Sequence, residues 1–287
     1  MGDKLQTITE IHRYITGMLS RLWPPNEAKA MASSIISEYT GMNSASQLAF
    51  GDRMPDESRL EMILAAAARA SEGEPLQYIF GYTAFCGHRI EVTPGVLIPR
   101  PETEEMTNMI IRENEGFSGT ITDLGTGSGC IAVALSLAFP LSTVIAIDNS
   151  PAALKAATGN IELNGASVTL RETDILTLDP ATVPVSDIIV SNPPYVTESE
   201  KKAMHINVLD HEPHEALFVP DNDPLVYYRK IVTIADSRLT AGGKLWFEVN
   251  ENLAEETAGL ADPGTWSEVM VKKDISGKKR FLKAEKK

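Results

Sequence analysis

Residues 123–129 read Asp-Leu-Gly-Thr-Gly-Ser-Gly and follow a short apolar run that begins near Thr120. Glycines lack a Cβ, so such a loop can turn tightly and let a ligand approach its backbone. A helix-forming apolar segment follows at once, and the first N–H groups of a helix have no partner within it. A strand, a glycine-rich loop and a helix in this order predict a nucleoside site in an α/β sheet.

Acidic residues beyond the loop also favour a nucleoside. Asp148 ends the next predicted strand, about 20 residues further on, where a carboxylate can accept both hydroxyls of a ribose. Asp174 and Ile175 follow the third predicted strand, where the carboxylate or the adjacent backbone can meet an adenine edge. The spacing Gly-x-Gly-x-Gly is shorter than the usual dinucleotide pattern. These features by themselves leave NAD and S-adenosylmethionine both open.

From about residue 119 onward, predicted strands and helices alternate. This alternation indicates a mostly parallel sheet with helices on both faces. The predicted helices lie near residues 104–113, 129–138, 151–164 and 224–239. The predicted strands are Thr120–Leu124, Thr143–Asp148, Val168–Glu172, Asp187–Ser191, Lys244–Val249, Ser267–Lys272 and Arg280–Lys283.

The N-terminal part has helical patterning instead. One apolar stripe recurs at three- and four-residue steps, typical of a single helical face, and comprises Leu5, Ile8, Ile11, Ile15, Leu19 and Leu22. Short β-prone runs at Tyr82–Phe85 and Arg89–Val92 predict a hairpin between the two parts. We expect a helical domain over 1–80, a hairpin linker over 81–103 and the α/β domain over 104–287.

The composition and charge of the chain disfavour several classes of protein, namely nucleic-acid-binding, membrane-spanning and disulfide-rich proteins. A hydrophobic share of 43% and a charged share of 23% are ordinary for a soluble globular protein. The net charge of −13 disfavours a broad nucleic-acid footprint. No apolar run approaches the roughly 20 residues that span a bilayer. Two cysteines, Cys86 and Cys130, make a disulfide framework unexpected, so we expect a cytoplasmic protein that does not bind a membrane.

The loop Asn192-Pro193-Pro194-Tyr195 follows the predicted strand at 187–191, at the carboxyl edge of the sheet. An amide or aryl amine nitrogen is a poor nucleophile because its lone pair is delocalised. Two acceptors that bind both of its hydrogens can orient that lone pair toward an electrophile. The Asn192 side-chain oxygen and the Pro193 carbonyl supply them, and the prolines add no N–H donor. Tyr195 offers a flat face to a planar group.

The matching electrophile is a sulfonium methyl group, which is already cationic and needs neither a metal nor a strong base. Rate enhancement then comes mainly from alignment and electrostatic support. Adenine-N6 methylation of nucleic acid is a rival reading, which the net charge of −13 counts against. A third interpretation is an adaptor protein that binds the donor without catalysis. Such a protein would have no use for the intact loop Asn192–Tyr195, which argues against this interpretation.

At these residues the chain resembles the release-factor glutamine methyltransferase family over nearly its whole length. Glu74–Ile79 and Val96–Glu104 look like the linker signatures of that family. Residues 123–129 resemble its donor loop, and Ser191–Tyr195 resemble its substrate loop. Asp274–Arg280 resemble its closing Asp-x-x-Gly-x-x-Arg segment.

The resemblance implies a Rossmann-like, seven-stranded class I methyltransferase domain, preceded by a small helical domain and a linking hairpin. It implies methyl transfer from S-adenosylmethionine to the N5 nitrogen of a glutamine in class I peptide chain release factors, which modulates translation termination. S-adenosylhomocysteine is the product, and no metal and no direct nucleic-acid contact are implied. We expect a monomer.

The resemblance also implies a role for each matching residue. Asp148 contacts the ribose, Asn192 contacts both donor and substrate, and Pro193 and Tyr195 hold the glutamine. The methionine and ribose portion of the donor is lined by Gly125, Thr126, Gly127, Ser128 and Gly129.

Some positions depart from the family or leave alternatives open. A sister family that methylates a ribosomal protein tends to have Ser-Pro where residues 101–103 read Pro-Glu-Thr, which favours the release-factor branch. Ile175 stands where the family often has an aromatic residue, and Asn250 stands where it has glycine. Glu248 is either near the site or a satisfied structural acid. A solvated loop that acts as a lid, rather than a metal site, is predicted around His205, His211 and His214.

Overall fold

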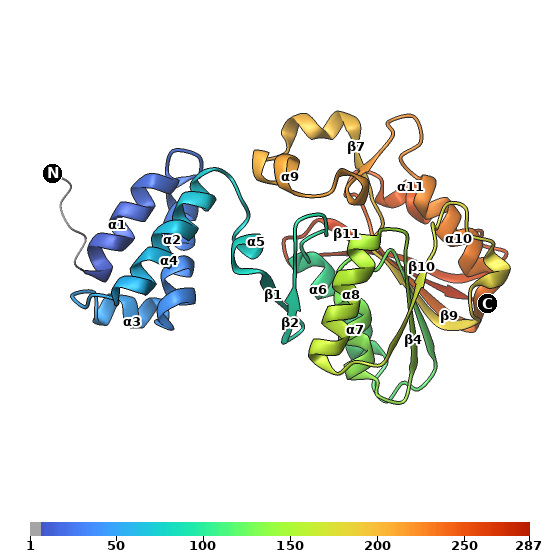
Figure 1. Cartoon of the computed structure of the whole chain (residues 1–287). Helices are drawn as coiled ribbons and strands as arrows, with labels where there is room; N and C mark the ends of the chain where they lie inside the picture. The colour runs from blue at the N-terminus through green and yellow to red at the C-terminus, as the bar shows by residue number, and fades with distance from the viewer. Residues whose placement is uncertain (1–6) are drawn as a thin grey trace. The chain divides into compact units, whose positions relative to one another are not determined.

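In this computed structural model residues 7–287 are described, so Leu5 of the first predicted stripe lies outside them. The chain divides into two compact units, and Figure 1 labels most of the elements of both. One unit runs up to Gly81 and includes His205–His211. The other comprises Tyr82–Met204 and Glu212–Lys287. In the described part, no helix is long and apolar enough to cross a membrane.

The smaller unit is a bundle of helices whose apolar stripes face one another. Its elements are α1 (Ile8–Leu19), α2 (Pro25–Thr40), α3 (Ser44–Ala49), α4 (Glu57–Ser71), α5 (Leu76–Phe80) and α9 (Ile206–His211). Thr7 and Glu10 form a capping box at the start of α1. The Trp23 indole donates a hydrogen bond to the carbonyl oxygen of Ala70 over 3.1 Å. Four residues of the predicted stripe form the buried face of α1, namely Ile8, Ile11, Ile15 and Leu19. Leu22 lies beyond the end of α1 and packs, partly buried, against the same core.

Several helix boundaries differ from the sequence prediction. Helices α3, α5 and α9 have five or six residues each, too few to show a repeat of 3.6 residues. Helix α6 spans Pro101–Glu113, so the predicted start at residue 104 is wrong. Proline suits the first helical position because its missing N–H would have no partner there.

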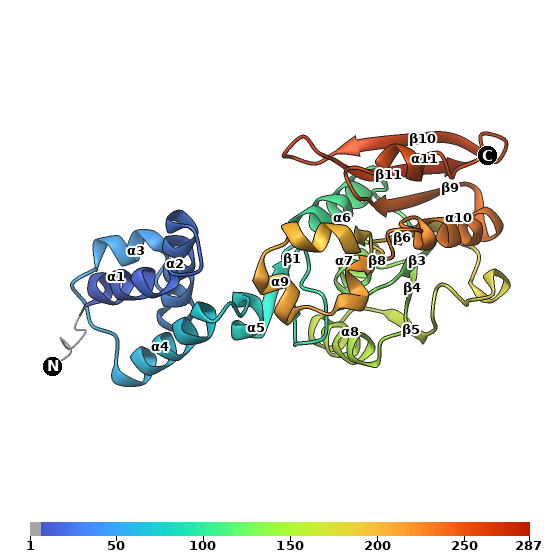
Figure 2. The same cartoon turned by 90° about the horizontal axis from the view of Figure 1, so that it is seen from above.

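The larger unit is built on a seven-stranded sheet in the order β10-β11-β9-β6-β3-β4-β5. The five strands from β9 to β5 pair in parallel, whereas β11 runs antiparallel to both β9 and β10. Figure 2 shows β10 and β11 at one edge of this sheet. The strands are β3 (Thr120–Leu124), β4 (Thr143–Asp148), β5 (Val168–Glu172), β6 (Ser186–Ser191), β9 (Leu239–Glu248), β10 (Trp266–Lys273) and β11 (Lys279–Lys286).

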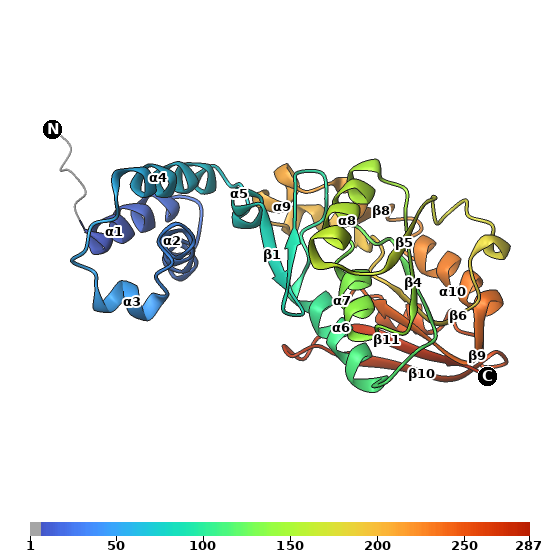
Figure 3. The same cartoon turned by 60° about the horizontal axis from the view of Figure 1, so that its bottom comes forward.

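Helices flank this sheet in two groups. Helices α7 (Cys130–Ala138) and α8 (Pro151–Asn164) lie side by side, and α6 contacts α7 (Figure 3). Helices α10 (Val226–Arg238) and α11 (Ala254–Ala258) bury their apolar side chains with those of the strands in one cluster. Ile145 and Ile147 of β4 belong to that cluster, so the alternate residues of the strand face the other way. The predicted α/β architecture with a seven-stranded sheet is confirmed.

The hairpin β1 (Tyr82–Phe85) and β2 (His88–Glu91) closes through a two-residue turn. Cys86 and Gly87 both have positive φ, at +49° and +79°, as this type of turn requires. Asn160 of α8 accepts from the backbone N–H of Glu91 over 2.7 Å and donates to the carbonyl oxygen of Ser128 over 2.9 Å. One buried amide therefore ties the hairpin to the glycine-rich loop.

Candidate functional site

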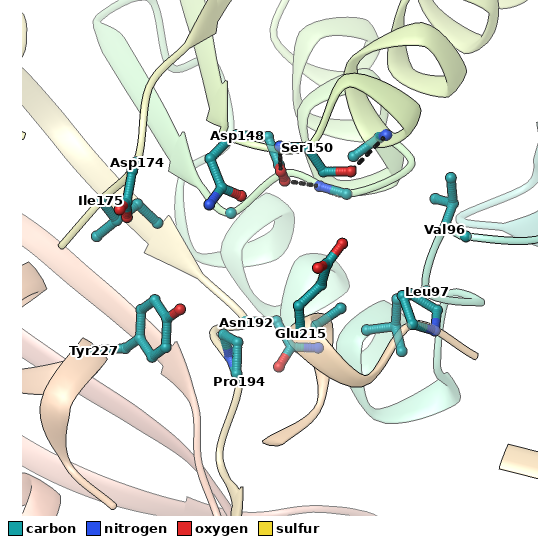
Figure 4. Close-up of a pocket in the computed structure, with 17 residues that line it drawn as sticks. Val96, Leu97, Asp148, Ser150, Asp174, Ile175, Asn192, Pro194, Glu215 and Tyr227 are labelled. Atoms are coloured by element: carbon teal, nitrogen blue, oxygen red, sulfur yellow. Dashed lines mark hydrogen bonds between the residues drawn. The ribbon is translucent and has the colours of Figure 1, made fainter. Parts of the chain in front are cut away.

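A cavity that opens to solvent is lined by the loops that follow β3, β4, β5 and β6. The chain turns from one half of the sheet to the other between β3 and β6, and ligand sites of open α/β sheets form at such a point. Figure 4 shows the side chains around the cavity. Seven of the predicted site residues line it, namely Gly125, Gly127, Asp148, Asp174, Ile175, Asn192 and Pro194.

The glycines of the loop serve different purposes. Gly125 and Gly127 line the cavity and have φ of +77° and +56°, which side chains other than glycine rarely adopt. Gly129, with φ of +79°, does not line it. A Cβ on Gly129 would lie 3.0 Å from the Cβ of Ala157, so this glycine allows α7 to begin close against α8. Thr126 and Ser128 are buried behind the cavity wall.

Two aspartates hold the loop in shape. The Thr126 hydroxyl donates to the buried Asp123 carboxylate over 2.6 Å. Burial raises the pKa of Asp123 to about 7, although this hydrogen bond opposes the rise. Asp148 accepts from the backbone N–H of Gly127 over 2.8 Å and from that of Ser150 over 2.9 Å. Each Asp148 oxygen keeps a second acceptor position for a ligand hydroxyl.

Tyr227 lies on the same side of the cavity as Asp174 and Ile175 (Figure 4). Burial raises the pKa of its phenol, and the charges of Asp174 and Asp148 raise it further. An aromatic ring is therefore present although Ile175 replaces the aromatic residue of the family. The sequence did not point to Tyr227, because it belongs to α10, far along the chain from the third strand.

Part of the loop Asn192–Tyr195, which follows β6, lines the cavity, and the rest of it packs against the core. Asn192 and Pro194 line the cavity, whereas Pro193 is buried outside its lining. The ring of Tyr195 packs against the apolar cluster of α10 and the sheet, and its hydroxyl donates to Glu248 over 2.8 Å. Asn250 donates to the Tyr195 carbonyl oxygen over 3.1 Å, so this departure from the family motif braces the same loop.

Glu248 is buried at the end of β9 and accepts two hydroxyl groups. Thr103 of α6 donates to it over 2.6 Å, in addition to Tyr195. Burial raises the pKa of Glu248, while both hydrogen bonds and the charge of Arg280 oppose the rise. Asn192 in turn donates from Nδ2 to Thr103 over 3.0 Å. The hydrogen-bonding capacity of Glu248 is thus used within the protein, and Glu248 also lies next to the site through Thr103 and Asn192. Both interpretations of Glu248 made from the sequence therefore apply.

The segment that follows Asn192–Tyr195 contributes to the cavity wall through Glu215 and Ala216. Glu212 fixes this segment because its buried carboxylate pairs with Arg100 over 2.6 Å and accepts the N–H of Ile98 over 3.2 Å. Within residues 7–287, no group of three or more His, Cys, Asp or Glu side chains is arranged to hold a metal ion. The role of this segment as a lid stays a prediction.

The charges of the cavity discriminate between the two nucleosides that the sequence left open. Asp148, Asp174 and Glu215 line it, and its wall contains no lysine, arginine or histidine among the described residues. Three carboxylates repel a pyrophosphate and attract a cation. The site therefore fits S-adenosylmethionine, whose sulfonium and amino groups are cationic, better than NAD.

Known proteins resemble this chain over nearly its whole length. Residues 99–218 match the family model described as methyltransferase small domain, and residues 19–81 match the PrmC N-terminal domain. A release factor glutamine methyltransferase of Bacteroides thetaiotaomicron is 41% identical over 97% of this chain and 100% of its own length. Another, of Flavobacterium psychrophilum, is 47% identical over 74% of this chain and 75% of its own.

Among solved structures, a methyltransferase from Pyrococcus furiosus superimposes with a TM-score of 0.51 at 19% sequence identity. The match covers 80% of this chain and 98% of that one. At this identity the likeness concerns the fold alone.

Proposed function

The chain belongs to the family of release factor glutamine methyltransferases, and on that premise we propose that it methylates N5 of a glutamine in a class I peptide chain release factor. The family membership itself makes the protein an S-adenosylmethionine-dependent protein glutamine methyltransferase. One observation of the site supports the reaction in this proposal. Asn192 and Pro194 line the same cavity as the glycine-rich loop and Asp148, which is the arrangement that a bound donor and a glutamine amide would need.

In this proposal some residues of the site bind the donor and others bind the glutamine. The backbone at Gly125 and Gly127 and the Asp148 carboxylate hold the donor, and the Tyr227 ring offers its adenine an apolar surface. When bound, S-adenosylmethionine supplies a cationic methyl group as the electrophile. Asn192 Oδ1 accepts one amide hydrogen of the glutamine, and a backbone carbonyl oxygen of the loop Asn192–Tyr195 accepts the other, which turns the nitrogen lone pair of the glutamine toward that group.

The proposal is tested with a purified class I release factor, an oligonucleotide, and S-adenosylmethionine labelled in its methyl group. A single added methyl group of about 14 Da on the release factor, mapped by peptide fragmentation to a glutamine side chain, is the expected result. Label in the oligonucleotide alone contradicts the proposal in favour of adenine-N6 methylation. Transfer to a ribosomal protein and not to the release factor contradicts the assigned substrate.

We further propose that the helical domain over residues 1–80 docks the release factor, that the hairpin at 81–103 links it to the catalytic domain, and that the protein acts as a cytoplasmic monomer in translation termination. Exposed apolar side chains on the helices support docking there, Leu48 most clearly at 88% exposure. Leu48→Glu should raise KM for the release factor severalfold without changing donor affinity. The matched control is Leu141→Glu, on a leucine that is 81% exposed in the larger unit. Equal KM values for the two variants contradict docking at Leu48.

A further inference from the structure

A chain of buried polar groups lies behind Asn192 and does not contact the cavity. Asn192 Nδ2 donates to the Thr103 hydroxyl over 3.0 Å, and that hydroxyl donates to Glu248 Oε2 over 2.6 Å. The other oxygen of Glu248 accepts the Tyr195 hydroxyl over 2.8 Å. Thr103 is 3% exposed and Glu248 is 1% exposed, so the protein itself supplies the partners of these groups.

The number of hydrogens available fixes the direction of this chain. Both oxygens of Glu248 accept a hydroxyl hydrogen, one from Thr103 and one from Tyr195, and a threonine hydroxyl has a single hydrogen. Because Glu248 takes that hydrogen, only the lone pairs of the Thr103 oxygen remain for Asn192. A lone pair accepts from an NH2 group and gains nothing from a carbonyl oxygen. The Asn192 amide is therefore held with its nitrogen toward Thr103 and its oxygen on the opposite side.

This direction matters because the two ends of an asparagine amide have nearly the same shape but opposite hydrogen-bonding roles. With the amide reversed, its NH2 group would face the NH2 group of the substrate glutamine, and neither could accept. We propose that Thr103 and Glu248 are positioning residues that keep the Asn192 oxygen directed at the substrate amide. This inference rests on the proposed function, in which Asn192 accepts a hydrogen from the glutamine.

A purely structural role for the network predicts different behaviour. The carboxylate would then serve only to satisfy Thr103 and Tyr195, and loss of the Thr103 hydroxyl would lower stability without acting through Asn192. Measurements of kcat for methyl transfer distinguish the two roles. Variants that lack one threonine hydroxyl are compared first, and the same change is then made in a chain that lacks the Asn192 amide.

The experiment compares Thr103→Val with Thr107→Val in the full-length enzyme. Thr107 is also fully buried on α6, one turn further on, but its hydroxyl donates to the Thr103 carbonyl oxygen over 2.8 Å and does not reach Asn192. Loss of one orienting hydrogen bond corresponds to about a tenfold fall in kcat. We expect this fall for Thr103→Val with KM for the donor little changed, recovery of most of it in Thr103→Ser, and an unchanged kcat for Thr107→Val.

The same Thr103→Val change is then made in an Asn192→Ala background. If Thr103 acts through Asn192, it has nothing left to orient there, and kcat should fall less than about twofold further. An undiminished tenfold fall in that background overturns the inference, as does an unchanged kcat for Thr103→Val alone. If Asn192→Ala itself leaves kcat unchanged, the proposed function fails, so the two failures are distinguishable.

Discussion

Replacing Gly129 by alanine tests whether this glycine serves packing rather than the donor. Its φ of +79° costs an alanine about 1–2 kcal/mol. The new Cβ would lie 3.0 Å from the Cβ and 3.2 Å from the Cα of Ala157, and such overpacking costs about 1–3 kcal/mol more. We therefore expect Gly129→Ala to lower the free energy of unfolding by about 2–5 kcal/mol.

Gly165→Ala is the matched control. Gly165 also has a positive φ, +65°, but a Cβ there would have no atom within 4 Å, so only the backbone cost of about 1–2 kcal/mol applies. Removing the Ala157 methyl group should relieve part of the crowding. The double variant Gly129→Ala/Ala157→Gly is thus expected to lose less than the two single changes added together.

Urea unfolding followed by circular dichroism measures these free energies, and calorimetry measures donor affinity in the folded variants. We expect Gly129→Ala to bind the donor within about threefold of the unmodified chain, because Gly129 does not line the cavity. An equal loss of stability in Gly129→Ala and Gly165→Ala would refute the reasoning from Ala157. So would a tenfold loss of donor affinity at unchanged stability.

Three further predictions concern the site. Asn192→Ala should lower kcat a few hundredfold while donor affinity stays within about tenfold, because about 3 kcal/mol of stabilisation specific to the transition state is lost. An unchanged kcat in a fixed-time methylation assay contradicts this prediction. Asp148→Ala should instead weaken donor binding about tenfold or more by calorimetry, because a charged hydrogen-bond acceptor is removed; equal affinity argues against its contact with the ribose. Burial raises the pKa of Asp123 from 3.8 to about 7, so the folded state keeps this proton where the unfolded chain releases it. Its contribution is complete below about pH 4 and is lost as the pH rises through 7, so the chain should lose up to about 4 kcal/mol relative to Asp123→Asn over that range. Parallel pH profiles of the two unfolding free energies contradict the raised pKa.

Most of the sheet followed from local sequence. Strands β3, β4 and β5 have the predicted bounds. Strands β3 and β4 are short buried segments between turn residues. Strand β5 is an edge strand without buried residues, in which Val168 and Leu170 alternate with polar residues. Strand β9 starts at Leu239 rather than at residue 244, since its first half carries Gly242 and Gly243 and is recognised only by its pairing with β6. The membership of His205–His211 in the helical unit has no counterpart in any local pattern.

The sequence by itself determined the strand, glycine-rich loop and helix at 120–138, the aspartates Asp148 and Asp174 at the ends of two strands, and the donor-poor loop at Asn192, because these depend on residue type and on short spacings. Only the tertiary structure decided that Gly129 meets Ala157, that Tyr227 faces the cavity, and that Thr103 and Glu248 stand behind Asn192. Each of these contacts joins elements far apart in the chain. They arise because the carboxyl ends of neighbouring parallel strands come together at one edge of the sheet, whatever separates them in sequence.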